Sequence, residues 1–150
     1  MLLMNTNDTT AAPPRALEGI RVLDVTQVMA GPICAMQLCD MGADVMVFAE
    51  VSGCVHGDRA QPVSRRPKLK RGDWAGFGKA MNEVARHLRS RDVRLAYHHH
   101  MGTVVESEAD VDSLMAATGP DVGLLLDTGH LTYAGGDPVA VIRRHGKRIN

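Results

Sequence analysis

Short apolar runs alternate along the chain with longer segments in which apolar residues recur every three or four positions. The apolar runs at residues 20–26, 45–49, 93–97 and 122–126 predict four buried β-strands. Helical spacing or helix-start residues mark the segments 32–42, 73–90, 107–117 and 137–146 between and after them. This order predicts an α/β fold, with a parallel sheet of about four strands and covering helices.

Local signals set the expected helix ends. Asp73 is the expected N-cap of the second helix, and Ser107 with Asp110 fits a capping box for the third. Pro138 opens the last helix, because proline is tolerated in the first turn, and residues 148–150 resemble the start of a further strand. Residues 1–15 are expected to form a disordered leader, and residues 50–72 a long loop that is a candidate wall of a site.

Length and charge narrow the class of protein. A chain of 150 residues suits one domain but is short for a complete (β/α) barrel of about 250 residues. The 17 basic residues balance the 17 acidic ones, which argues against nucleic acid or an anionic membrane as a partner. No apolar run reaches the roughly 18 residues of a membrane helix, and the three cysteines form no CxxC pair. We therefore expect a soluble, cytoplasmic protein.

Residues able to bind a metal follow three of the predicted strands. Glu50 follows the second strand, His98 to His100 follow the third, and Asp127 to His130 follow the fourth. Functional groups of parallel α/β folds gather at the carboxyl ends of the strands. Side-chain alternation places His98 and His100 on one side of the sheet and His99 on the other. A carboxylate facing an imidazole across adjacent strand ends is a sound half-site for a divalent metal.

Each of these features has a simpler interpretation. Three consecutive histidines suit a solvated loop, Asp127-Thr-Gly suits a turn or an N-cap, and Glu50 suits an exposed strand end. Their coincidence at the ends of two apolar strands favours a site. His56, in the long loop, stays undecided. The basic stretch 59–71 suits a solvated loop or a grip on a polar substrate better than nucleic acid, because no aromatic residues interleave it.

Residues 46–150 resemble the inosose dehydratases of inositol catabolism. The resemblance rests on the motifs YHHHMGT at 97–103 and LLLDTGH at 124–130, with similar segments before and after them. It implies part of a sugar-isomerase-like (β/α) barrel, of which the strands ending at Glu50, His98 and Asp127 would be the fourth, fifth and sixth. The activity implied is dehydration of 2-keto-myo-inositol (scyllo-inosose), a polyol ketone, with a divalent metal such as manganese or cobalt.

The same resemblance implies roles for five residues. Asp127 and His98 would be metal ligands, although the wider superfamily usually has a glutamate where His98 stands. His130 would hold or protonate the substrate, with His100 and Glu50 as acid–base candidates. Two further ligands would come from later strands, so we expect a partial barrel with little or no lyase activity. Its exposed sheet edges would favour association into a homo-oligomer.

Residues 16–45 resemble a different family. The run ALEGIRVLDVTQVMAGPICAMQLCDMGADV is similar to the amino-terminal segment of family III CoA-transferases. This resemblance implies a Rossmann-like βαβ unit of a CoA-binding domain, but the catalytic aspartate of those enzymes lies in a region without a counterpart here. Two alternatives to the lyase therefore stay open, a CoA-binding fragment and a nonfunctional fusion fragment.

Overall fold

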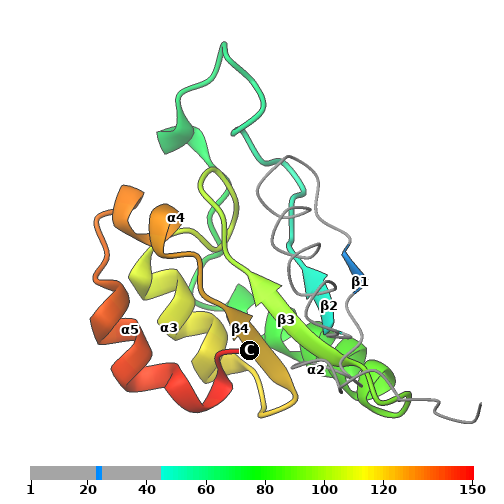
Figure 1. Cartoon of the computed structure of the whole chain (residues 1–150). Helices are drawn as coiled ribbons and strands as arrows, with labels where there is room; N and C mark the ends of the chain where they lie inside the picture. The colour runs from blue at the N-terminus through cyan, green and yellow to red at the C-terminus, as the bar shows by residue number, and fades with distance from the viewer. Residues whose placement is uncertain (1–22, 25–44) are drawn as a thin grey trace, which may run out of the picture.

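The computed structural model describes residues 23–24 and 45–150. The expected leader at 1–15 and the expected helix at 32–42 lie outside the described residues. The elements, in chain order, are β1 (Leu23–Asp24), β2 (Val45–Phe48), the 3-10 helix η1 (Val63–Arg65), α2 (Asp73–Arg89), β3 (Arg94–His98), α3 (Glu108–Ala117), β4 (Val122–Leu125), α4 (Thr128–Tyr133), α5 (Pro138–His145) and η2 (Gly146–Arg148) (Figure 1). The alternation of strands and helices confirms the predicted α/β class.

The sheet is parallel and is wound in chain order. Its strands lie in the order β1-β2-β3-β4, so each strand pairs with the one that precedes it in the chain. Ile149 forms an isolated parallel bridge with Leu124, and the Asn150 N–H donates to the Leu124 carbonyl at 3.1 Å, so residues 149–150 lie beside β4, whereas Arg148, expected to start a further strand, belongs to η2. A doubly wound sheet reverses its strand order at a switch point, whereas a (β/α) barrel keeps it. The topology is therefore that of part of a barrel.

The core lies between the sheet and the helices α2 and α3. Alternate residues of β3 and β4 point toward these helices, namely Leu95, Tyr97, Val122 and Leu124, and all four are buried. Their partners in the same cluster include Met81, Ala85, Val111, Leu114 and Met115. The residues between them on β3, Ala96 and His98, are also buried, although they point to the opposite face of the sheet. Burial on both faces explains why the strands read as nearly continuous apolar runs.

The helix starts follow the predicted caps with one correction. Ser107 and Asp110 form the capping box of α3, and the Asp137 carboxylate accepts the Val139 N–H at 2.9 Å at the start of α5. Asp73, however, is not an N-cap, because α2 begins at Asp73 itself and Gly72 precedes it. The Asp73 carboxylate accepts the Lys70 N–H at 2.9 Å, so it closes the preceding turn instead. Helix α4 was not predicted at all.

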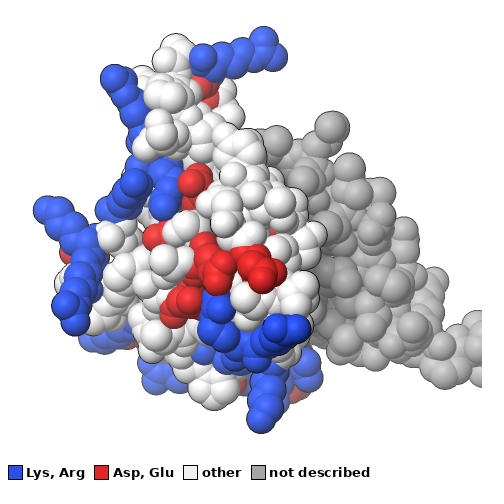
Figure 2. Space-filling view, turned by 90° about the vertical axis from the view of Figure 1, so that its left-hand side faces the viewer, with Lys and Arg blue, Asp and Glu red and all other residues white. Residues whose placement is uncertain are grey.

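Charged side chains of both signs cover the face formed by α3 and α5. Arg144 contacts Glu108 at 2.6 Å and Asp112 at 3.1 Å, and thereby ties the two helices together. Figure 2 shows this face with acidic groups near its centre and lysines and arginines around them (Figure 2). The face is therefore of mixed charge. None of the helices in the described part of the chain has the length and apolar character needed to cross a bilayer.

Two glycines of α2 give a matched test of how closely α2 packs on α3. A Cβ at Gly78 would overlap the backbone carbonyl of Ala117, whereas a Cβ at Gly76 would have no atom within 4 Å. We expect Gly78→Ala to lower the free energy of unfolding by about 1–3 kcal/mol through overpacking. Gly76→Ala should raise it by about 0.5–1 kcal/mol, because alanine favours the helix. Urea unfolding measures both, and equal effects would contradict the close approach of the helices.

Candidate metal centre

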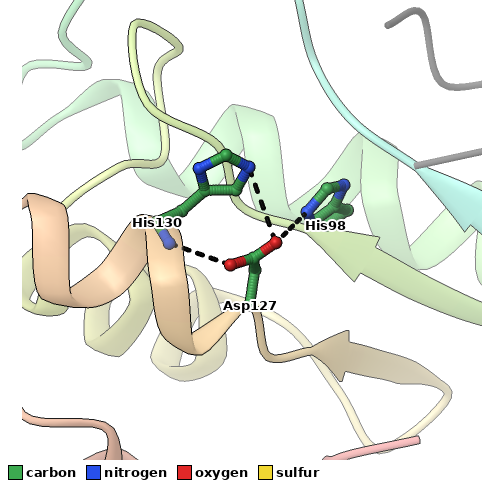
Figure 3. Close-up of side chains that lie close together, drawn as sticks. All are labelled: His98, Asp127 and His130. Atoms are coloured by element: carbon green, nitrogen blue, oxygen red, sulfur yellow. Dashed lines mark hydrogen bonds and ion pairs between the residues drawn. The ribbon is translucent and has the colours of Figure 1, made fainter. Parts of the chain in front are cut away.

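Three side chains converge at the carboxyl ends of β3 and β4. His98 is the last residue of β3, Asp127 lies two residues beyond β4, and His130 lies in the first turn of α4. The Nε2 atoms of His98 and His130 each lie 3.5 Å from Asp127 Oδ2. The three potential ligand atoms lie within 4.8 Å of one another, as Figure 3 shows (Figure 3). The side chains predicted to face a common space do so.

The strand register explains this convergence. His98 pairs with Leu125 across the parallel ladder. Two further residues along the chain bring Asp127 back to the same side as Leu125, because side chains alternate between faces. His98 and Asp127 therefore share the face of the sheet opposite α2 and α3, which is the interior side of a barrel.

Asp127 also starts the helix that carries His130. Its Oδ1 atom accepts the His130 N–H at 2.8 Å, which makes Asp127 the N-cap of α4. The other oxygen, Oδ2, is left to face the two imidazoles. The N-cap interpretation and the ligand interpretation of Asp127 are thus compatible, since each uses a different carboxylate oxygen.

His99 supports the backbone of Asp127. Its side chain is fully buried, and its Nε2 accepts the backbone N–H of Asp127 at 3.1 Å. Alternation predicts that His99 points away from His98, but no motif in the sequence predicts this contact. His99 therefore fixes the backbone from which the Asp127 carboxylate projects.

Two more histidines extend the cluster. The ring centroid of His100 lies 3.9 Å from that of His130 and 5.7 Å from that of His98. His56, from the loop at 50–72, places its ring centroid 4.6 Å from that of His100. His98, His100, His130 and His56 thus form a continuous group of imidazoles. The sequence left His56 undecided, because nothing in the loop indicates where it folds back.

Glu50 lies outside this group of imidazoles in the contacts that the structure records. It follows β2 as predicted, and its Oε1 atom accepts the Ser52 N–H of its own loop at 2.7 Å. The Tyr97 hydroxyl lies 3.4 Å from the Glu50 backbone N–H. An acid–base role for Glu50 stays a prediction.

The protonation states of these side chains favour the binding of a cation. Burial lowers the pKa of His98, although the charge of Asp127 opposes this effect, and burial together with His100 lowers the pKa of His130. Burial tends to raise the pKa of Asp127, but the His130 N–H bond and the two imidazoles lower it overall. Metal binding requires neutral imidazole and ionised carboxylate. Both forms are therefore favoured at neutral pH.

The donor atoms fit a divalent cation. The Nε2 atoms of His98 and His130 are buried without a hydrogen-bond partner, and such unsatisfied atoms are rare in folded proteins. Donors bound at about 2.0–2.2 Å to one ion lie roughly 3.0–3.5 Å apart in neighbouring positions, and the two distances of 3.5 Å from Asp127 to the imidazoles are close to this spacing. Two imidazole nitrogens and one carboxylate oxygen suit manganese, cobalt or zinc. The residues therefore fit the group that the sequence implied.

A parallel sheet wound in chain order, with ligand-type side chains at its carboxyl edge, defines the class of (β/α)-barrel proteins. Within that class, the chain belongs to the xylose isomerase-like TIM barrel family, which matches residues 33–150. This match begins inside the segment 16–45 that resembles CoA-transferases. Nothing in the comparisons supports that second resemblance.

Several relatives are named as a rhizopine catabolism protein or as inosose dehydratases. The rhizopine catabolism protein MocC of Rhizobium meliloti is 46% identical over 112 residues, which are 75% of this chain and 34% of that protein. Inosose dehydratases of Clostridium tetani and Lacticaseibacillus casei are 34% and 38% identical, over 75% and 73% of this chain and 38% and 37% of theirs. The chain thus spans little more than a third of the length of these relatives.

One solved structure shares the fold at low sequence identity. It is the crystal structure of a probable 3-DHS dehydratase, AsbF, involved in petrobactin synthesis in Bacillus anthracis. The TM-score is 0.56 at 11% identity, and the alignment covers 86% of this chain and 47% of that one. This likeness supports the partial-barrel architecture.

The buried His99 predicts acid-sensitive stability in the metal-free chain. Burial, followed by the charge of His98, lowers the pKa of His99 to about 4. Between pH 6.5 and 4 the unfolded chain therefore binds a proton that the folded chain does not, so stability is full above pH 6.5 and falls as pH falls. The loss should reach about 3 kcal/mol at pH 4.

Urea unfolding with a chelator at several pH values tests this prediction. His99→Gln keeps an acceptor for the Asp127 N–H but cannot titrate. The part of the pH-dependent loss in the free energy of unfolding that comes from His99 should therefore be absent in this variant. His87→Gln, on an exposed position of α2, is the matched control and should leave the slope unchanged. If the free energy of unfolding of His99→Gln falls with pH as steeply as that of the parent chain, His99 is not the source of the acid sensitivity.

Proposed function

We propose that this chain is the metal-binding part of a hydro-lyase that removes water from a cyclic polyol ketone of the inosose type. The observation that carries the proposal is the meeting of His98, Asp127 and His130 at the carboxyl edge of the sheet. The inosose dehydratases among the relatives support the substrate class. Manganese or cobalt is the proposed metal.

The side chains can divide the chemistry between them. His98 and Asp127 would hold the cation, with His130 as a third donor or as a substrate contact. The bound cation would polarise the substrate ketone and make the neighbouring C–H group more acidic. His100 suits the base, because its Nδ1 lies 2.8 Å from the Met101 carbonyl and, as the donor there, leaves Nε2 to accept a proton. Glu50 is the alternative base.

The overall step balances without a further reactant. The base takes the proton from the carbon beside the ketone, and the electrons of that C–H bond form a new C=C bond. The C–O bond of the β-hydroxyl breaks, and the proton that His100 has taken up passes to this oxygen through the adjacent ring of His130, so that the hydroxyl leaves as water. The enol that remains becomes a diketone by proton transfer.

Two further expectations belong to this proposal. A reducing, cytoplasmic setting agrees with Cys54, which is a free thiol in the described part of the chain. Association of copies through an exposed sheet edge stays a prediction that the comparisons do not address.

Removal of the Asp127 charge should strongly weaken metal binding while the N-cap of α4 is kept. Asp127→Asn retains a capping group for α4 but removes the carboxylate that faces the imidazoles. We expect the affinity for Mn²⁺, measured by calorimetry, to fall by about 100-fold or more. Asp121→Asn, exposed at the opposite end of β4, is the matched control and should bind Mn²⁺ like the parent chain. Parent-like binding by Asp127→Asn would exclude the proposed centre.

Activity gives a second test. With scyllo-inosose and Mn²⁺ we expect slow dehydration by the purified chain, because these strands supply only part of the expected ligand set. The rate should disappear with a chelator and in Asp127→Asn. Dehydration that persists in both conditions would contradict a metal-dependent lyase.

A further inference from the structure

A buried arginine fastens the loop 50–72 onto the segment that follows β3. The Arg66 side chain is 8% exposed. Its guanidinium contacts Glu106 at 3.1 Å and Asp110 at 2.6 Å, and it donates to the carbonyl oxygens of Thr103 at 3.1 Å and Val104 at 3.3 Å. Arg66 thus uses all of its nitrogens on residues about 40 positions away in the chain.

A second set of contacts lies beside His56. The Val55 N–H donates to the Gly102 carbonyl at 3.1 Å, and the Gly102 N–H donates to Glu106 at 2.6 Å. Gly102 has a φ of +77°, and a Cβ there would stand 2.8 Å from the His56 backbone nitrogen. Glu106 therefore holds Gly102 with one oxygen and Arg66 with the other, and glycine permits the two backbones to touch.

The consequence of both contacts is the placement of His56. Its half-buried ring packs against His100, and its Nδ1 atom is buried without a hydrogen-bond partner. A buried ion-pair network seldom stabilises a fold more than apolar packing would, because its charges lose their hydration. What the network supplies here is a fixed geometry for the loop. His56 stands outside the group of three ligand atoms, so its position suits a substrate contact better than a metal ligand.

We propose that His56 is a substrate-contacting residue, which hydrogen-bonds a hydroxyl group of the polyol, and that Arg66 is the residue that positions it. An imidazole offers one donor and one acceptor, which matches a hydroxyl group. The inference rests on the proposed function and adds to it that the loop 50–72 forms a wall of the substrate site.

Binding of myo-inositol to the Mn²⁺-saturated chain tests the role of His56. This polyol has no ketone and cannot be dehydrated, so calorimetry reports binding alone. We expect His56→Ala to weaken myo-inositol binding by about tenfold, the effect of one hydrogen bond, and to change Mn²⁺ affinity by less than about twofold. His56→Gln should restore part of the affinity, and His87→Ala should match the parent chain.

A double-mutant cycle tests the role of Arg66. Arg66→Lys keeps the positive charge but loses the planar fork that reaches both carboxylates. It should weaken myo-inositol binding about as much as His56→Ala, and it should add nothing in the His56→Ala background. Additive losses in the double variant would overturn the positioning role.

The outcomes separate this inference from the function on which it rests. If the parent chain binds Mn²⁺ and myo-inositol and His56→Ala binds the polyol equally well, the inference fails and the metal centre stands. Loss of Mn²⁺ affinity in both His56→Ala and His56→Gln would also overturn it, because His56 would then be a ligand. Failure of the parent chain to bind Mn²⁺ would overturn the proposed function together with the inference.

Discussion

The parallel register of β3 on β4 is the constraint on which the rest of the molecule depends. It sets His98 opposite Leu125 and so brings Asp127 to the same side of the sheet. The register is held by the core, because Tyr97 and Leu124 pack side by side in the cluster formed with α2 and α3. A slip of one residue would turn every side chain of the strand to the other face. The packing of the core and the position of the candidate site therefore both depend on the hydrogen-bonded pairing of β3 with β4.

Asp127 joins the backbone to the candidate chemistry. One carboxylate oxygen of Asp127 caps α4, the other faces two imidazoles, and the Asp127 N–H donates to His99. Because Asp127 caps α4, the side chain of His130 in the first turn of that helix lies next to the Asp127 carboxylate. Fold and site are thus linked at one residue, which explains how the three donor atoms, two of them buried and unpartnered imidazole nitrogens, are held so close together.

The sequence predicted the parts of this arrangement that depend on near neighbours. Strand alternation correctly predicted that His98 and Asp127 face a common space, and the capping box of α3 was correct because it depends on spacing alone. The sequence does not predict helix α4, because its six residues are too few to show a periodic pattern. Asp73 was assigned as a cap because its residue type favours that position, but its carboxylate closes the preceding turn.

The class of fold, the strands that carry candidate ligands and the face to which His98 points follow from the order of residues alone, because side-chain periods of 2 and 3.6 are local properties of the backbone. Packing in three dimensions was needed to show that His56 joins this group and that Arg66 holds the loop beside it. These contacts join residues dozens of positions apart, and burial and ion pairing select them once the chain has closed. The spacing of residues along the sequence does not predict contacts of this kind.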